Sequence, residues 1–295
     1  MTTAVKAFDD GMGSPVKQAP FWRRLARRKA STVCFGIVVT IVVLAVLAPI
    51  LPIPDPDEIR SANRLAGPGQ KGYLLGADEL GRDVLSRLIW GARVSLMAGF
   101  GASIAALLFG GAIGLVAGFF GKWVDTILMR STDVILAFPS ILLAVGVVAA
   151  LGPGLNNAMI AVAIAGFPLY ARVVRGSVLS ARENTYVEAA RSIGVSNFRI
   201  MWRHILPNIL APIIVALSLD VGIKIVITSS LSFLGLGAQP PTADWGNMIA
   251  SGKDYIRVSA HLVMMPGFAI FLIALCLNVV GDQLRDVLDP RLKNT

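Results

Sequence analysis

The chain has 295 residues, of which 55% are hydrophobic and only 15% are charged, and its formal net charge at pH 7 is +9. Average soluble chains carry about 25% charged residues. Together with a mean hydropathy of +0.69, this shortage of charge excludes an ordinary water-soluble enzyme and a disordered chain. The composition predicts a protein of the lipid bilayer, in which a basic excess is typical of cytoplasmic loops rather than of nucleic-acid binding.

Uncharged stretches of about 20 residues predict transmembrane helices in chain order. A basic cytoplasmic tail over 1–32 precedes a retained anchor helix at 33–51, and an extracytoplasmic segment follows over 52–94. The uncharged run 134–171 is too long for one span, and the turn at Gly152-Pro153-Gly154 divides it into two. Five further spans are therefore expected at 95–119, 134–151, 156–174, 209–230 and 261–280, before a cytoplasmic C-terminus over 281–295.

The distribution of Lys and Arg predicts the orientation. Segments on the side of the N-terminus carry more than twice as many of these residues as the segments on the opposite side. Cytoplasmic loops carry such an excess, which favours an arrangement with both termini inside. The fold class is therefore an all-α polytopic membrane protein with six transmembrane helices.

The longest inner loop, 175–208, has the pattern of two short helices. Thr185 and Glu188 have the spacing of a capping box, and Gly194 stands where a helix C-terminal glycine belongs. Pro207 is expected to end the second helix. That helix follows Ser196 and places its apolar residues at helical spacing on one face: Phe198, Met201, Trp202 and Ile205.

This loop carries a family resemblance. The sequence Glu188-Ala189-Ala190, then Gly194, then Leu206-Pro207, resembles the EAA loop of ATP-binding cassette (ABC) importer permeases. Other segments resemble the C-type permease subunit of dipeptide, oligopeptide and nickel importers, and the resemblance covers roughly residues 20–295. They are LGADELGRDVLSR at 75–87, DVILAFP at 133–139, LSFLGLG at 231–237 and the C-terminal run at 281–291.

The resemblance implies a type I ABC-importer permease fold, with residues 95–280 as a five-helix core behind the anchor helix. It implies a non-catalytic subunit of a dipeptide or oligopeptide importer in the bacterial cytoplasmic (inner) membrane. The implied partners are a second homologous permease, two ABC ATPase subunits and an extracytoplasmic substrate-binding protein. ATP and Mg would be bound by the ATPases, so this chain needs no cofactor or metal of its own. The residues implied to dock the ATPase are Glu188, Ala189, Ala190, Gly194, Leu206 and Pro207.

Three residues of the fifth span are candidates for the translocation path: Asp220, Lys224 and Thr228. Ionisable residues inside a membrane usually face the bundle interior or water. Because Asp220 and Lys224 are four residues apart on a helix, they are equally consistent with a self-neutralising structural pair.

Several alternatives remain open at this stage. An importer of nickel or another small solute has the same architecture, and the intramembrane charges alone would suit an ion-coupled secondary transporter. A membrane enzyme would need clustered catalytic side chains. Asp78, Glu79 and Asp83 are expected to form a solvated or protein-facing outer segment rather than a cation site. Gly110, Gly114 and Gly118 recur every four residues and predict close helix packing.

Overall fold

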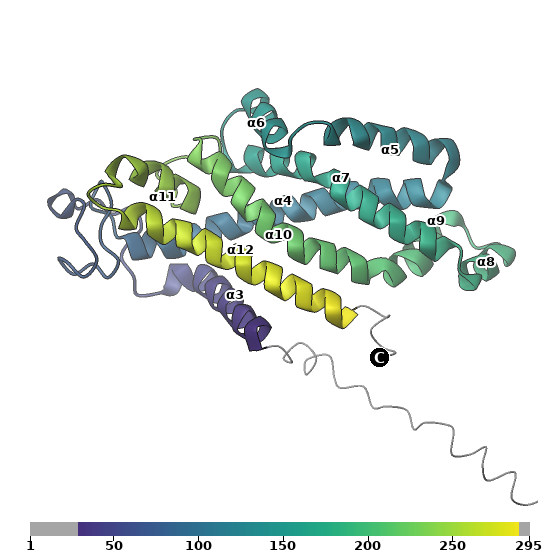
Figure 1. Cartoon of the computed structure of the whole chain (residues 1–295), viewed down its shortest axis with the longest axis horizontal. Helices are drawn as coiled ribbons and strands as arrows, with labels where there is room; N and C mark the ends of the chain where they lie inside the picture. Colours follow the sequence, from purple (N-terminus) through teal and green to yellow (C-terminus); the bar gives the residue numbers. More distant parts are fainter. Residues whose placement is uncertain (1–28, 289–295) are drawn as a thin grey trace, which may run out of the picture.

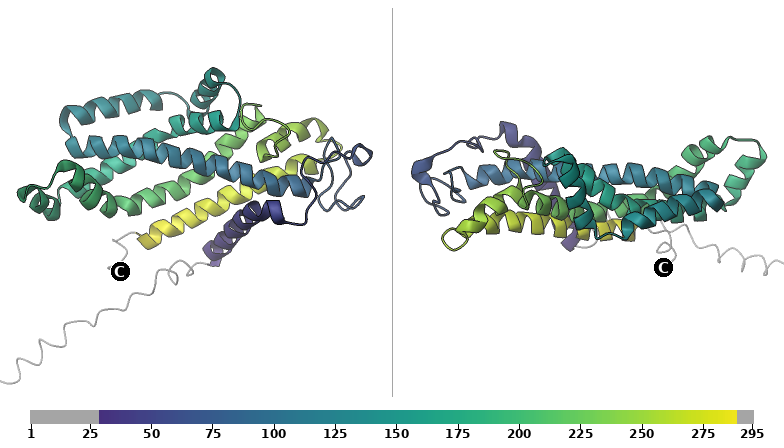
Figure 2. Two further views of the ribbon diagram at one scale, coloured as in Figure 1. Left: turned by 180° about the vertical axis from the view of Figure 1, so that it is seen from behind. Right: turned by 90° about the horizontal axis from the view of Figure 1, so that it is seen from above.

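The computed structural model of the protein describes residues 29–288. The predicted basic tail up to residue 28 and the C-terminal residues from 289 onward lie outside this range. The regular elements of the described part are helices, arranged as a bundle whose long members lie side by side (Figures 1 and 2). The all-α prediction is confirmed.

Within residues 29–288, five helices are long and apolar enough to cross a membrane. Helix α3 packs against α12 and α4 at one side of the bundle, and α4 packs along the length of α7. A bent helix pair, counted as one span, gives the six spans that the sequence predicts. The five long helices are α3 (Lys29–Leu47), α4 (Val84–Phe120), α7 (Leu155–Arg182), α10 (Leu210–Phe233) and α12 (His261–Leu288).

The bent pair differs from the predicted third span, 134–151. Helix α5 (Lys122–Leu136) starts twelve residues before that span, and α6 (Ser140–Leu151) leaves it at 89°. Pro139 stands at the break, where it prevents a continuous helix. Because α5 carries charged residues, a search for uncharged runs does not find it. Its two aspartates are paired: Asp125 accepts a 2.6 Å hydrogen bond from Arg175 of α7, and Asp133 accepts one of 2.8 Å from Arg172.

Helix α4 also begins earlier than predicted, at Val84 instead of residue 95. Asp83 caps its first turn by accepting the Ser86 backbone N–H at 2.8 Å. Polar and charged residues of this first stretch, such as Arg87, are buried by contacts described below. The outer segment between helices is therefore shorter than the predicted 52–94.

The glycine repeat of α4 does what the spacing predicts. A side chain at Gly114 would clash with the backbone carbonyl oxygen of Ala171, and one at Gly118 would lie 2.8 Å from Val178. Glycine therefore allows the α4 and α7 backbones to touch. Arg182 joins the same two helices at their inner ends by donating to the Gly118 carbonyl at 2.8 Å.

The remaining elements are short. They are η1 (Ala48–Ile50), η2 (Ser61–Asn63), α8 (Thr185–Ser192), α9 (Asn197–Arg199), η3 (Ile200–Ile205), η4 (Leu206–Ile209), α11 (Trp245–Gly252) and η5 (Lys253–Tyr255). Helices α8 and α9 lie at one end of the bundle, and α11 with the segment 51–83 lies at the other (Figure 1). The two ends therefore carry separate candidate sites.

Candidate functional site

The predicted ATPase-docking residues lie on a protrusion at one end of the bundle, which we call the projection and define as residues 183–209. It contains α8, a turn, and the chain of short helices α9, η3 and η4. Glu188 and Ala189 are exposed, Ala190 is buried, and Gly194 and Pro207 are exposed. Leu206 is half-buried and packs against the buried cluster beneath.

Helix α8 begins one residue earlier than a capping box requires. Asn184 rather than Thr185 precedes the first turn, and its side chain makes no capping bond. Instead its amide nitrogen donates to the carbonyl of Ala181 at 3.0 Å, which ties α8 to the end of α7. The predicted capping box is therefore wrong, and the exposed Glu188 carboxylate is not committed to such a cap.

The turn after α8 confirms the role predicted for Gly194. Its φ of +76° lies in the left-handed region that favours glycine. The Gly194 N–H donates to the Arg191 carbonyl, and the Val195 N–H donates to the Ala190 carbonyl, both at 3.0 Å. These two bonds form a Schellman motif. Because no atom lies within 4 Å of the position a side chain would take, glycine is needed for conformation and not for space.

The second half of the projection departs from prediction in two ways. Met201 and Ile205 are buried while Phe198 and Trp202 are exposed, so the four do not form one face. The cause is the wider π-helical turn of η3, which changes the angular spacing of side chains. Pro207 does not end the helix either, because it lies in the first turn of η4, where its missing N–H is not required. Residues 197–233 form one continuous helical path into α10.

The base of the projection is buried against the bundle, and its tip is exposed. Val187, Ile200 and Ile205 are fully buried in a cluster with Val178 of α7 and Phe119 of α4. At the tip, Ile193 is 80% exposed, Phe198 67% and Trp202 53%. An apolar tip on a rigid base is suited to binding a soluble protein, because aromatic side chains often dominate such contacts.

A cavity of about 920 Å³ opens where the projection meets the bundle. Small and polar residues of α7 form one wall, and the beginning of α10 forms the other. Its polar side chains include Ser177, Ser180, Asn184, Asn208 and Arg285. The cavity lies between the two helices that carry the projection.

The path candidates Asp220 and Lys224 are buried between α10, α7 and α4. The Lys224 ammonium lies 3.4 Å from an Asp220 carboxylate oxygen, and the two side chains are 6% and 3% exposed. Tyr170 of α7 donates to Asp220 at 2.9 Å, and Ser103 of α4 donates at 3.2 Å. This geometry is what the structural-pair alternative requires.

Two further residues complete this cluster. Gly166 of α7 leaves room for the end of Lys224, since a side chain at Gly166 would collide with it. The hydroxyl of Thr228 donates to backbone carbonyls of its own helix, to Lys224 at 2.9 Å and to Ile225 at 3.1 Å. Sequence patterns gave no sign of Ser103 and Tyr170, because hydrogen bonds between distant helices leave no periodic signal.

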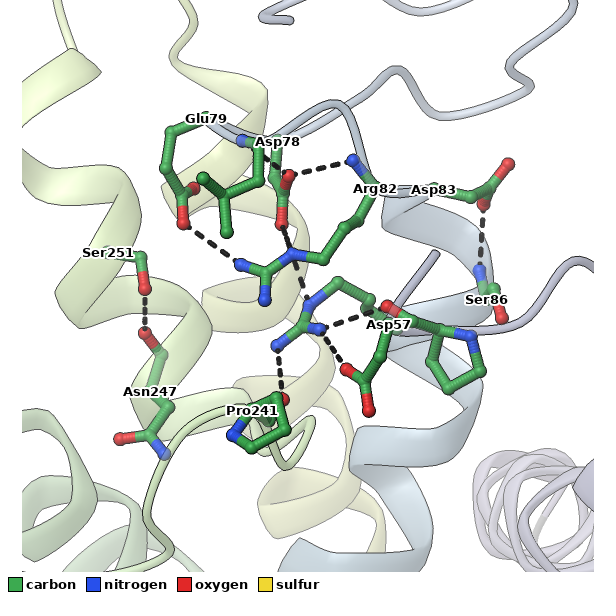
Figure 3. Close-up of polar contacts among 12 residues, drawn as sticks. Asp57, Asp78, Glu79, Arg82, Asp83, Ser86, Pro241, Asn247 and Ser251 are labelled. Carbon is green, nitrogen blue, oxygen red and sulfur yellow. Dashed lines mark hydrogen bonds and ion pairs between the residues drawn. The ribbon is translucent and has the colours of Figure 1, made fainter. Parts of the chain in front are cut away.

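At the opposite end, the acidic residues of the outer segment are engaged with protein groups (Figure 3). Asp78 accepts backbone N–H bonds from Leu80 and Arg82, and also accepts from Arg82 Nε at 2.6 Å. Glu79 accepts from the same guanidinium at 3.0 Å. The prediction of a protein-facing segment is confirmed for Asp78.

Arg87, to which the sequence pattern assigns no role of its own, joins three separate segments of the outer end. It donates to the Pro56 carbonyl at 3.0 Å, to Asp57 at 2.8 Å and to the Pro241 carbonyl at 3.3 Å. Nearby, the buried carboxyl of Asp244 accepts from Ser95 of α4 at 2.7 Å and caps α11. Burial raises the pKa of Asp244 above its ordinary value.

Comparison with known proteins adds independent findings. Residues 110–294 match the family described as binding-protein-dependent transport system inner membrane component. Residues 14–68 match the N-terminal transmembrane domain of oligopeptide transport permease C. Among solved structures, the inward-facing methionine ABC transporter MetNI matches with a TM-score of 0.56 over 69% of this chain and 96% of that chain. At 18% identity, that match concerns the fold alone.

Curated relatives match over nearly their whole length. The dipeptide transport system permease protein DppC of Alkalihalophilus pseudofirmus is 44% identical, over 95% of this chain and 91% of the relative. The di/tripeptide transport system permease protein DppC of Pseudomonas aeruginosa is 44% identical, over 95% and 94%. The glutathione transport system permease protein GsiD of Pectobacterium atrosepticum is 42% identical, over 93% and 91%.

Proposed function

The chain belongs to the family of binding-protein-dependent transport system inner membrane components, and from this membership we propose that it is a permease subunit of an ATP-driven importer of dipeptides or oligopeptides. The observation that carries the substrate class is the near-complete match to relatives named for dipeptide, di/tripeptide and glutathione transport. The protein lies in the bacterial inner membrane and forms half of the translocation path beside a second, homologous permease.

The projection docks into one of two ABC ATPase subunits. Its exposed tip, with Ile193, Phe198 and Trp202 around the Gly194 turn, supplies the apolar contact. Glu188 and Ala189 are exposed on α8 beside it, where they meet the same partner surface. Leu206 and Pro207 lie where the chain passes from the projection into α10. They set the direction in which the projection points and are not part of its exposed tip. ATP and Mg are bound by the ATPases, and this chain is not catalytic.

The physical role of the projection is to transmit movement. Its base packs on α4 and α7, and its second half is continuous with α10. When ATP closes the motor, the two docked projections move together and carry these helices with them. Rotation of the permease halves then exposes the path outward, as in other rigid-body switches. An extracytoplasmic binding protein delivers the peptide at the end formed by the segment 51–83 and α11.

Affinity purification of the chain from its native membrane in mild detergent tests the assembly. We expect a sister permease, P-loop ATPases and a binding protein to be recovered and identified by mass spectrometry. Proteoliposomes holding this complex are expected to import radiolabelled dialanine only with ATP on the ATPase side and the binding protein on the other. Recovery of the chain alone, with uptake independent of ATP, would instead establish a self-sufficient carrier.

The variant Glu188→Lys tests the docking role. It reverses an exposed charge on the projection and is expected to leave the protein in the membrane while abolishing substrate-stimulated ATP hydrolysis and uptake. Asp282→Lys makes the same change at an exposed position of α12, outside the projection and outside the end that receives the binding protein, and should retain coupling. Normal transport by Glu188→Lys would show that the docking assignment is wrong.

A further inference from the structure

An apolar groove of about 220 Å³ runs between α3 and α4 near their outer ends. Its walls are Val42, Ala45 and Val46 of α3 and Leu96, Met97 and Phe100 of α4. Val46 is 66% exposed and Met97 54%, so the groove opens on the outside of this chain. The anchor span ends at Ile50, which places the groove about 6 to 12 Å inside that end at 1.5 Å per residue.

One cation borders this groove. Arg93 lies in the α4 span, is exposed, and contributes to the groove lining. Its guanidinium carbon is 6.0 Å from the Trp90 ring centroid. Over residues 29–288 it has no carboxylate within salt-bridge distance, unlike Arg87, Arg172 and Arg175. An exposed charge at membrane depth is costly unless an anion or water meets it.

The direction of the Arg93 side chain selects the kind of anion. Side chains of a helix tilt toward its N-terminus, and the N-terminus of α4 is at the outer end. The guanidinium therefore reaches toward the outer membrane–water boundary, where tryptophan residues such as Trp90 also concentrate. Lipid phosphates lie at that boundary, and their acyl chains extend from it toward the middle of the membrane. The apolar groove extends from Arg93 in the same direction, so the two arrangements match.

We propose that the groove between α3 and α4 binds one phospholipid of the outer leaflet, with its phosphate on Arg93 and an acyl chain along Val46 and Met97. The lipid fills the space between the anchor helix and the core and neutralises a charge for which the described chain provides no partner. Free phosphate does not fit this assignment, because most of the lining is apolar. A sister permease lying over the groove would be an alternative occupant.

Native mass spectrometry of the delipidated, assembled complex tests the proposal by titration with dioleoyl phosphatidylglycerol. We expect one lipid to bind more tightly than the background of further lipids. Arg93→Gln should weaken that first binding by about fivefold or more, the effect of one basic residue at a lipid surface, and Arg93→Lys should retain most of it. Dioleoylglycerol, which lacks the phosphate, should bind the wild type as weakly as the phospholipid binds Arg93→Gln.

Matched variants separate the groove from general effects. Val46→Trp fills the groove and should abolish the tight binding with Arg93 intact, whereas Val33→Trp, at an exposed position of the inner half of α3, should not. Arg130→Gln removes an exposed arginine elsewhere, on α5, and should leave binding unchanged. Equal binding by wild type, Arg93→Gln and Val46→Trp would overturn the proposal. So would saturation by inorganic phosphate alone, or efficient cross-linking of Met97→Cys to the sister permease.

Discussion

Replacing Lys224 by methionine is expected to destabilise the bundle, because it leaves Asp220 buried without its counter-charge. The two charged atoms are 3.4 Å apart, and neither side chain is more than 6% exposed. Removing one partner of a buried ion pair costs about 3 to 5 kcal/mol. Tyr170 and Ser103 still donate to Asp220, so the lower figure applies. At about 2 to 4 °C per kcal/mol for a domain of this size, the expected loss is roughly 6 to 12 °C in Tm.

The double variant Asp220→Asn, Lys224→Met supplies the decisive comparison. It removes both charges and keeps an oxygen that accepts from Tyr170. We expect it to regain most of the lost stability, so that the two substitutions are strongly non-additive. The assay is thermal unfolding of the assembled importer in detergent, with dipeptide uptake measured in parallel on the same preparations.

Two outcomes would refute the structural-pair interpretation. One is a Tm of Lys224→Met within about 2 °C of the wild type, corresponding to less than about 1 kcal/mol. The other is a change of uptake or substrate selectivity in variants whose stability is unchanged, which would place Asp220 and Lys224 on the translocation path. A loss of folding yield that the double variant repairs would support the pair.

Three further predictions follow from individual contacts. Gly114→Ala forces a side chain against the backbone of α7 and should lower the free energy of unfolding by about 1 to 3 kcal/mol, as measured by thermal unfolding. In the control Gly111→Ala the added carbon would lie 3.6 Å from its nearest neighbour, and this variant should be nearly as stable as the wild type. Cys276 of α12 is buried whereas Cys34 of α3 is partly exposed, so a maleimide should label Cys34 faster than Cys276 in the folded protein, and equal labelling rates would contradict this packing of α12. Burial raises the pKa of Asp244, so the folded state favours the protonated carboxyl. The free energy of unfolding should therefore fall as the pH rises from 3.8, the ordinary pKa of this carboxyl, through its raised pKa in the folded protein. Asp244→Asn should flatten this pH dependence, and an unchanged pH dependence would show that another group causes it.

The sequence alone predicted those elements whose physical cause is local. Uncharged runs of sufficient length located α3, α7 and α12, and Gly194 marked the turn of the projection because a left-handed backbone conformation requires glycine. The glycine repeat of α4 predicted close packing, since small residues at that spacing have few other uses in a membrane.

The features that sequence analysis missed depend on partners far along the chain. The charges of α5 predict a loop, whereas Arg172 and Arg175, some forty to fifty residues later, neutralise its two aspartates. Arg87 donates to Asp57 and also to the carbonyl of Pro241, which lies 154 residues beyond Arg87 in the chain. No local sequence pattern shows such a contact. The prediction that Pro207 ends the helix is wrong for a different reason. Proline interrupts a helix when it lies in the helix interior, but it is tolerated in the first turn.

The arrangement of these long-range contacts explains how one end of the protein can act on the other. A displacement of the projection is transmitted to α7 and α4 through its buried base. It is transmitted to α10 directly, because residues 197–233 are one helical path. About 21 Å along this helical path from Leu206, at 1.5 Å per residue, Asp220 of α10 receives hydrogen bonds from both α4 and α7.

The three helices are thus joined at the inner end and again within the bundle, which opposes sliding of one helix past another. At the outer end, Asp244 accepts from Ser95 of α4, and the Trp245 indole donates to the Leu88 carbonyl of the same helix at 2.9 Å. The loop between α10 and α12 is therefore fixed to α4 as well. A buried charge pair is a weak source of stability, but as part of this series of cross-links it keeps the core moving as one body, which the proposed transmission of movement from the projection requires.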